Sequence, residues 1–219
     1  MRLLFLLSFF FPALHALIPL AVQKNIEQHV ASNGWPQLYY DVLPNVLQTY
    51  PFKTVLEVGV ALGGHAETLL NHSSIETYYG VDPYCCYDPN DAFTLDIASY
   101  SNESLQANFD YLFEWVRDVR LAPYQSRIQL IRKPSVEASA SFENESLDCI
   151  FIDGDHRYEA VVEDLTAWYP KLKKGGLILG DDYWMEEVER GVNHYFSRNE
   201  QIFFLTSNSG YKIWAVKKI

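Results

Sequence analysis

Cysteine and positive charge are both in short supply in this 219-residue chain. Of its three cysteines, Cys85 and Cys86 are adjacent, which would strain a disulfide between them, and Cys149 lies in an apolar run. This spacing fits neither a zinc site nor a disulfide framework. The 17 Lys and Arg are outnumbered by 28 Asp and Glu, so the formal net charge is −11. Because clustered cations bind nucleic-acid backbones, and no basic stripe is present, the composition argues against a nucleic-acid partner.

The phosphate-binding glycine motifs are also missing. The segment KTVLEVGVALGGH (residues 53–65) has the spacing Glu57-x-Gly59-x-x-x-Gly63, which is neither GxGxxG nor a P-loop with its Lys-Ser/Thr. We predict a buried strand over Thr54–Val58, a glycine-rich turn and then a helix. Glycines let a backbone approach a ligand closely, and an acid beside the turn suits a zwitterionic ligand without phosphate.

One apolar run is long, and it lies at the N-terminus. The stretch from Leu3 to Val22 is about long enough to cross a bilayer, although prolines and a histidine interrupt it. We interpret residues 1–22 as a secretory signal or membrane anchor. The alternative is an apolar arm that packs on the domain or on a second subunit. Localisation stays open between secretory targeting, membrane association through residues 3–22 and the cytoplasm. Residues 23–219 are predicted to form one domain.

The stretch from Leu147 to Tyr183 organises this domain. An apolar run, Leu147–Ile152, ends in Asp153, and apolar residues then recur at helical spacing from Tyr158. The Lys-Lys-Gly-Gly at 173–176 is expected to close that helix. A second apolar run, from Leu177, ends in Asp181 and Asp182. The pattern predicts a βαβ unit, with both strands buried in a parallel sheet.

A right-handed βαβ crossover brings both strand ends to one edge of the sheet, where open α/β sheets bind ligands. Asp153, Asp181 and Asp182 can therefore converge, and three carboxylates repel unless a cation lies among them. A hard ion such as Mg²⁺ suits oxygen ligands. His156 could act there as a base. The alternative is that these residues are solvated turns that cap helices.

The strand predicted after the glycine-rich turn and its helix is also followed by an acidic residue. Thr77–Val81 is followed by Asp82, and an acid at the end of a second strand is placed to accept hydrogen bonds from ribose hydroxyls. A glycine turn with this acid, and with no phosphate signature, predicts a nucleoside cofactor without phosphate. S-adenosylmethionine meets that description.

From about Lys53 onward, the chain resembles the class I S-adenosylmethionine-dependent methyltransferases. The run IDGDHRYEAVVEDLTAWYPKLKKGGLILGDDY is similar to metal-dependent small-molecule O-methyltransferases of the macrocin and catechol type. The resemblance implies an α/β fold: a Rossmann-like, seven-stranded, mostly parallel sheet with a C-terminal antiparallel hairpin and helices on both faces. It implies a small-molecule hydroxyl as methyl acceptor and an association of subunits through N-terminal segments.

The same resemblance implies roles for single residues. The cofactor contacts would be Glu57, Gly59, Gly63, Asp82, Ser135 and Asp153. The metal ligands would be Asp153, Asp181 and Asp182, with Mg²⁺ as the ion. Asp153 and His156 would be catalytic, His156 as the general base.

The aromatic segment 83–100 would overhang the strand ends, so we interpret it as a substrate lid; a surface loop with a small core of its own is the alternative. Two functions compete with methyl transfer. One is a membrane-tethered or secreted binding module that keeps the fold without catalysis. The other, a nicotinamide oxidoreductase, is disfavoured because GxGxxG is absent.

Overall fold

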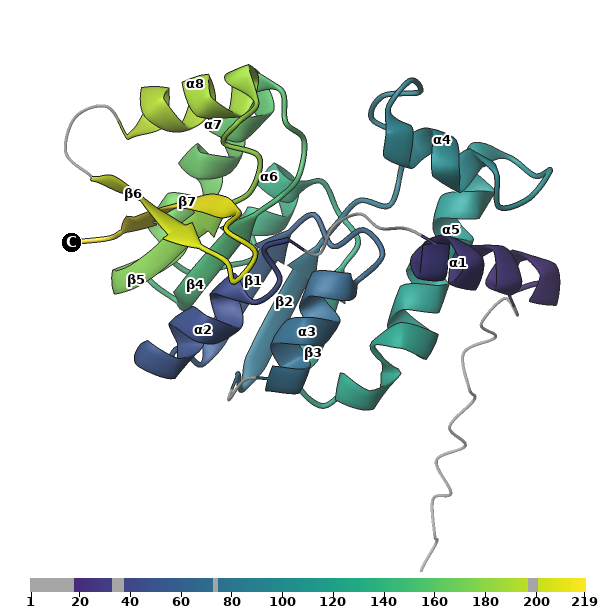
Figure 1. The fold of residues 1–219 in the computed structure, drawn as a ribbon, viewed down its shortest axis with the longest axis horizontal. Helices are drawn as coiled ribbons and strands as arrows, with labels where there is room; N and C mark the ends of the chain where they lie inside the picture. Colours follow the sequence, from purple (N-terminus) through teal and green to yellow (C-terminus); the bar gives the residue numbers. More distant parts are fainter. Residues whose placement is uncertain (1–17, 33–37, 73–74, 197–200) are drawn as a thin grey trace, which may run out of the picture.

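The computed structural model describes residues 18–32, 38–72, 75–196 and 201–219. Within them, a seven-stranded sheet has the order β3-β2-β1-β4-β5-β7-β6 (Figure 1). The strands are β1 (Thr54–Val58), β2 (Thr77–Val81), β3 (Ile128–Ile131), β4 (Leu147–Ile152), β5 (Leu172–Gly180), β6 (Ile202–Thr206) and β7 (Lys212–Lys217). The first five are parallel, and β7 is antiparallel to both β5 and β6. The predicted fold class is confirmed.

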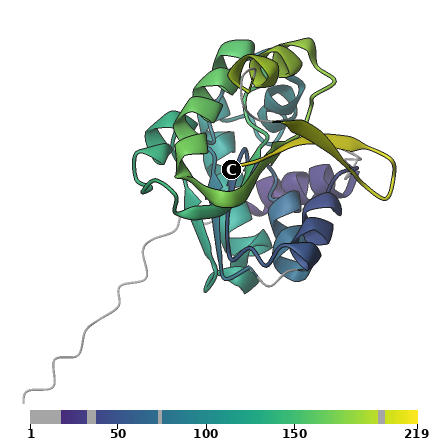
Figure 2. The same ribbon diagram turned by 90° about the vertical axis from the view of Figure 1, so that its left-hand side faces the viewer.

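Helices cover both faces of the sheet (Figure 2). They are α1 (Leu20–Ser32), α2 (Val42–Thr49), α3 (Gly64–His72), α4 (Ala92–Ala98), α5 (Leu105–Trp115), α6 (Ser135–Ser139), α7 (Tyr158–Trp168) and α8 (Glu186–Tyr195). In one core cluster, helices α1 through α5 pack on one face of the central strands. In a second cluster, helices α6 through α8 pack on the other face. Because β1 and β4 are buried on both faces, their sequences are nearly continuous apolar runs.

Helix α5 begins at Leu105, because the Ser104 hydroxyl accepts a hydrogen bond from the Ala107 N–H and caps it. The glycines and lysines at 173–176, expected to close α7, instead lie inside β5. Their strand carries a register irregularity opposite β4, and the Gly175 N–H donates to the Lys218 carbonyl.

Segment 83–100 folds as a packed insertion around α4. Tyr84, Ile97 and Tyr100 are buried in the core cluster that includes α5. The Asn25 side chain on α1 donates to the Tyr100 carbonyl at 2.8 Å, and the His29 ring bonds the Tyr100 hydroxyl. The insertion therefore packs into the core of the domain, while its role as a lid stays a prediction.

The N-terminal prediction falls mostly on residues 1–17, which lie outside the described residues. Helix α1 begins at Leu20, and Val22 is buried in the core, so the described end of that segment packs on the domain. No described helix is long and apolar enough to cross a membrane.

Candidate active site

The glycine-rich turn after β1 touches the end of β4. Gly59 has a φ of +86°, and a Cβ added there would lie 1.8 Å from the Asp153 carbonyl oxygen. The Asp153 N–H in turn donates to the Val58 carbonyl at 2.8 Å. Gly63 also has a positive φ, of +74°, at the start of α3. Only glycine allows this close backbone approach, and it brings two predicted cofactor residues, Gly59 and Asp153, into one place.

Asp82, which directly follows β2, binds the backbone of the same turn. Its carboxylate accepts hydrogen bonds from the N–H groups of Val60 at 3.0 Å, Ala61 at 2.9 Å and Tyr84 at 2.7 Å. Burial raises the pKa of Asp82, while these three donors oppose that rise. The predicted ribose acceptor thus lies beside the glycine turn, and it holds the turn's shape. Its contact with a ribose stays a prediction.

Glu57 lies underneath the turn and is 2% exposed. One carboxylate oxygen faces Nδ1 of His65 at 3.1 Å, and the other accepts a hydrogen bond from the Tyr78 hydroxyl. Both oxygens are therefore engaged by protein groups, which ties β1 to β2 and α3. A direct cofactor contact by Glu57 remains untested.

Three side chains at the ends of β4 and β5 form a candidate metal centre. One ligand atom from each of Asp153, His156 and Asp182 lies within 4.8 Å of the others. Nε2 of His156 is 3.0 Å from Asp182 Oδ2 and 3.5 Å from Asp153 Oδ1. The crossover therefore brings the predicted residues together. This group contains His156 where the prediction had Asp181.

Asp181 lies beside this group but is more deeply buried. Burial, followed by the charges of Asp153 and Asp182, raises its pKa to about 7. Its Oδ1 atom is buried and has no hydrogen-bond partner among the described residues. An orphaned oxygen next to two further carboxylates and an imidazole is a donor set that a hard divalent cation fits.

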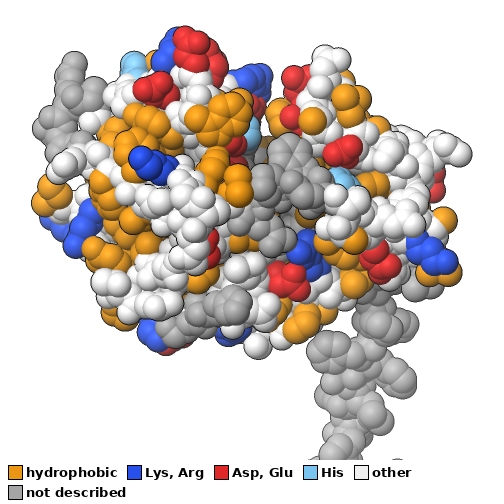
Figure 3. Space-filling view, in the orientation of Figure 1, with side chains coloured by type: hydrophobic (Ala, Val, Ile, Leu, Met, Phe, Trp, Pro, Cys, Tyr) orange, Lys and Arg blue, Asp and Glu red, His pale blue; other side chains and the backbone are white. Residues whose placement is uncertain are grey.

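The acidic surroundings also act on His156. Burial alone would lower its pKa, but the hydrogen bond and charge of Asp153, with the charges of Asp182 and Asp181, raise it to about 9. The edge therefore attracts positive charge. Figure 3 shows acidic and histidine side chains in a dip of the surface between the α8 side and the α4 side.

Ser135, a predicted cofactor contact, is the first residue of α6 and points toward α7. Its hydroxyl accepts a hydrogen bond from Trp168 Nε1 at 2.8 Å. It also bonds Asp164, whose pKa burial raises to about 6 in spite of that bond. The side chain is thus occupied by α7, and a cofactor contact by Ser135 stays a prediction.

Sequence reasoning missed Tyr39 and Tyr211. The Tyr39 hydroxyl donates to Asp153 Oδ2 at 2.6 Å, and the Tyr211 hydroxyl accepts from Trp184 Nε1 at 3.1 Å. Trp184, which flanks the acidic pair, is 73% exposed. No local pattern marks Tyr39, because its partner is 114 residues away in the chain.

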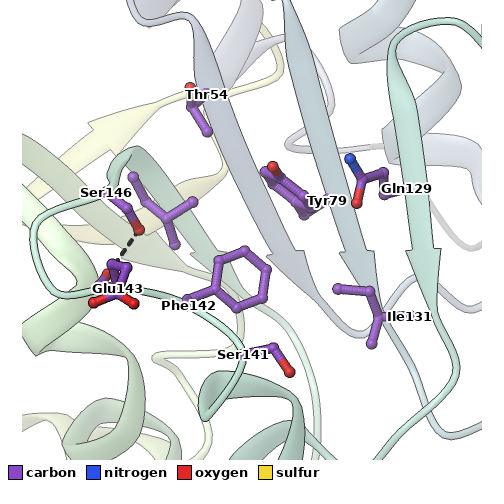
Figure 4. A pocket seen from close by; sticks show the side chains of 9 residues that line it. Thr54, Tyr79, Gln129, Ile131, Ser141, Phe142, Glu143 and Ser146 are labelled. Atoms are coloured by element: carbon purple, nitrogen blue, oxygen red, sulfur yellow. Dashed lines mark hydrogen bonds between the residues drawn. The ribbon is translucent and has the colours of Figure 1, made fainter.

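A separate hollow of about 310 Å³ lies on the face of the sheet, where Thr54, Tyr79 and Gln129 contribute from β1, β2 and β3. Residues 141–143, 146 and 147 form its other wall, and the Ser146 hydroxyl donates to the Glu143 carbonyl there at 2.7 Å (Figure 4). None of the predicted site residues lines it.

Comparison with known proteins decides the family. Residues 56–183, more than half of the chain, match a family model described as a methyltransferase domain. The chain belongs to this methyltransferase domain family. That match includes the glycine turn, Asp82, Asp181 and the three residues of the candidate metal centre. The predicted resemblance to class I S-adenosylmethionine-dependent methyltransferases is confirmed for family and fold.

Individual relatives are more distant. The uncharacterized protein R132 of Acanthamoeba polyphaga mimivirus is 28% identical over 167 residues, which are 71% of this chain and 66% of R132. The O-methyltransferase from Bacillus cereus, solved in complex with SAH, superposes with a TM-score of 0.53 at 16% identity, covering 93% of this chain and 94% of that one. Spermidine synthase from Thermotoga maritima gives 0.52 at 16% identity, covering 83% and 60%. The fold alone therefore does not identify the reaction.

Proposed function

We propose that this methyltransferase transfers the methyl group of S-adenosylmethionine to a hydroxyl oxygen of a small molecule, assisted by a divalent cation such as Mg²⁺. The observation that carries the proposal is the contact between the glycine turn and Asp153. It places a cofactor-type turn directly beside the Asp153–His156–Asp182 group.

The cofactor assignment is supported by the turn itself. Gly59 and Gly63 give close backbone access, Asp82 lies at the end of β2, and no lysine or Ser/Thr of a P-loop is present. The Bacillus cereus enzyme, which shares the fold, was solved with SAH, the demethylated form of this cofactor.

The acidic edge supports the metal. Asp153 and Asp182 would hold the ion, with Asp181 as a further ligand. When bound, a divalent cation would lower the pKa of the acceptor hydroxyl and orient it.

The chain's own residues would carry the proton. His156 Nε2, which lies 3.0 Å from Asp182 Oδ2, is within reach of a hydroxyl held at the edge. The acceptor oxygen would attack the methyl carbon in line with the sulfur, and the O–C bond forms as the C–S bond breaks. The electron pair stays on sulfur. The hydroxyl proton passes to His156, because a cation bound among the carboxylates would offset the charges that raise the pKa of the imidazole and so leave it neutral. The glycine turn and Asp153 would align the two reactants.

The exposed indole of Trp184, beside the acids, favours a small methyl acceptor with a flat surface. Its indole is held by the Tyr211 hydroxyl, so it is oriented despite its exposure. It would form one wall of the acceptor site.

The test is methyl transfer from methyl-labelled S-adenosylmethionine to a panel of sugars, phenols and catechols, with amines as a competing class. We expect label in hydroxyl acceptors with Mg²⁺ and its loss in chelator. Transfer to amines alone would contradict the O-methyltransferase assignment. Full activity in chelator would contradict the metal. Binding of cofactor without transfer to any class would favour a non-catalytic module.

A further inference from the structure

The two carboxylate oxygens of Asp153 face different partners. Oδ2 accepts a hydrogen bond of 2.6 Å from the Tyr39 hydroxyl, while Oδ1 faces His156 Nε2 at 3.5 Å. One oxygen is therefore fixed by a neutral donor, and the other is turned toward the candidate metal centre. The hydrogen-bond donor to Oδ2, Tyr39, thus comes from a segment 114 residues away in the chain.

The ring of Tyr39 is held firmly enough to define where its hydroxyl lies. It stacks on Phe151 of β4, with centroids 5.5 Å apart and planes at 23°. The ring of His65 meets it edge-on at 5.3 Å. Phe151 and Asp153 belong to the same strand end, so the stack and the hydrogen bond share one scaffold. Tyr39 cannot shift along β4 without losing both.

The turn between β6 and β7 clamps the segment that carries Tyr39. The Asn208 N–H donates to the Asp41 carboxylate at 2.8 Å, and the Ser209 hydroxyl donates to the Leu38 carbonyl at 3.1 Å. These bonds lie on both sides of Tyr39 in the chain. The C-terminal hairpin thus fixes an N-terminal segment over the end of β4.

We propose that Tyr39 is the positioning residue for Asp153: its hydroxyl fixes Oδ2 so that Oδ1 is presented to the bound cation. The inference rests on the proposed function. Hydrogen-bond partners outside the ligand shell orient ligating carboxylates, and their removal typically weakens metal binding about 10- to 100-fold. A tyrosine that only packed would transmit no such effect through its hydroxyl.

The experiment compares Tyr39→Phe with Tyr111→Phe in the full chain. Tyr111 offers a matched deletion, because its hydroxyl also donates to a carboxylate, Glu103 Oε1 at 3.0 Å, but on α5 away from the site. Mn²⁺, which takes the same oxygen ligands as Mg²⁺, serves as the probe, and free Mn²⁺ is followed by electron paramagnetic resonance. Thermal unfolding without added metal and titration with S-adenosylmethionine accompany each variant.

We expect Tyr39→Phe to weaken Mn²⁺ binding by about 10- to 100-fold, with cofactor affinity and unfolding midpoint largely unchanged. Tyr111→Phe should bind Mn²⁺ like the wild type. Unchanged or tighter Mn²⁺ binding by Tyr39→Phe would overturn the inference, as would an equal loss in both variants. If the wild type binds cofactor but its Mn²⁺ affinity is insensitive to Asp153→Asn, the metal site is misplaced and the inference falls with it. A folded wild type that binds neither ligand would overturn the proposed function itself.

Discussion

The parallel strands begin along one edge of the sheet, the amino edge, and end along the other, the carboxyl edge. The acidic side chains at these two edges differ in how well they are paired. At the edge where the parallel strands begin, the Asp148 carboxylate accepts hydrogen bonds from the N–H groups of Lys53 and Thr54, each at 2.9 Å, and from Lys173 Nζ at 2.7 Å. Burial would raise the pKa of Asp148, but these donors lower it below its usual range. At the opposite edge, Asp153, Asp181 and Asp182 crowd together, and the pKa of Asp181 rises to about 7.

This difference separates residues that stabilise the fold from residues that serve a ligand. A satisfied carboxylate such as Asp148 contributes free energy of folding, whereas crowded, partly orphaned carboxylates reduce it. Such an arrangement is retained where a bound cation or substrate offsets the repulsion. We therefore assign a structural role to the amino edge and propose the carboxyl edge as the functional one.

The largest expected effect comes from two glycines, one near each edge. Both have positive φ, +86° at Gly59 and +79° at Gly175, but an added Cβ at Gly175 meets nothing within 4 Å. Gly175→Ala should lower the free energy of unfolding only by the strain of a left-handed backbone, about 1 kcal/mol. Gly59→Ala adds a clash with the Asp153 backbone and should cost about 4 kcal/mol or more. Denaturant unfolding checks this, and equal costs would contradict the described approach of the turn to β4.

Neutralising one carboxylate at each edge should separate activity from stability. Asp153→Asn changes a proposed metal ligand itself, so it should lower turnover about 1,000-fold, more than the loss of a hydrogen-bond partner outside the ligand shell. The free energy of unfolding should stay equal or rise, because one of the crowded charges is removed. Asp148→Asn should keep turnover but lose about 2 kcal/mol of unfolding free energy, because a charged acceptor is lost. Paired turnover assays and denaturant melts measure both. An active, destabilised Asp153→Asn would reverse the assignment of the edges.

Substitution of His156 distinguishes a base from a ligand at the functional edge. His156→Gln should lower turnover about 100-fold and leave Mn²⁺ affinity nearly unchanged, as expected for a general base. The measurement pairs a turnover assay with the Mn²⁺ titration. If Mn²⁺ affinity collapses together with the rate, His156 is a ligand instead, in the place that the sequence prediction gave to Asp181.

The smallest effect concerns Asp164, beneath the functional edge. Its pKa of about 6 in the folded protein exceeds the 3.8 of an ordinary Asp, because burial disfavours its charge. Its contribution to the free energy of unfolding therefore falls as the pH rises from about 4 to 6. Asp164→Asn removes this dependence, so wild type should lose stability relative to the variant over that interval. Denaturant melts at both pH values check the sign, and a relative gain by the wild type would contradict it.

The sequence sufficed for the fold and for the meeting of the strand ends that carry the proposed site. Apolar runs that end in Asp153, Asp82 and Asp181 predicted strands, and the handedness of the crossover predicted that their ends meet. These inferences use backbone periodicity and topology, which local sequence encodes.

Side-chain orientation was beyond such reasoning. The hydrogen bonds of Tyr39 with Asp153, of Tyr78 with Glu57 and of Trp168 with Ser135 all join residues 21 or more positions apart. Each depends on how helices and loops pack over the sheet, so no spacing in the sequence reports it. The composition of residues 173–176 is typical of a helix end, but backbone hydrogen bonds of Gly175 and Gly176 with Lys218 accompany their place in β5.

The central claim is that the carboxyl edge binds S-adenosylmethionine beside a divalent cation. Calorimetric titration of the cofactor into the wild-type chain, with and without Mg²⁺, tests it most directly. The account predicts micromolar binding that Asp148→Asn leaves intact and Gly63→Ala, at the start of α3, weakens. A folded wild-type protein that shows no binding in either condition would contradict it.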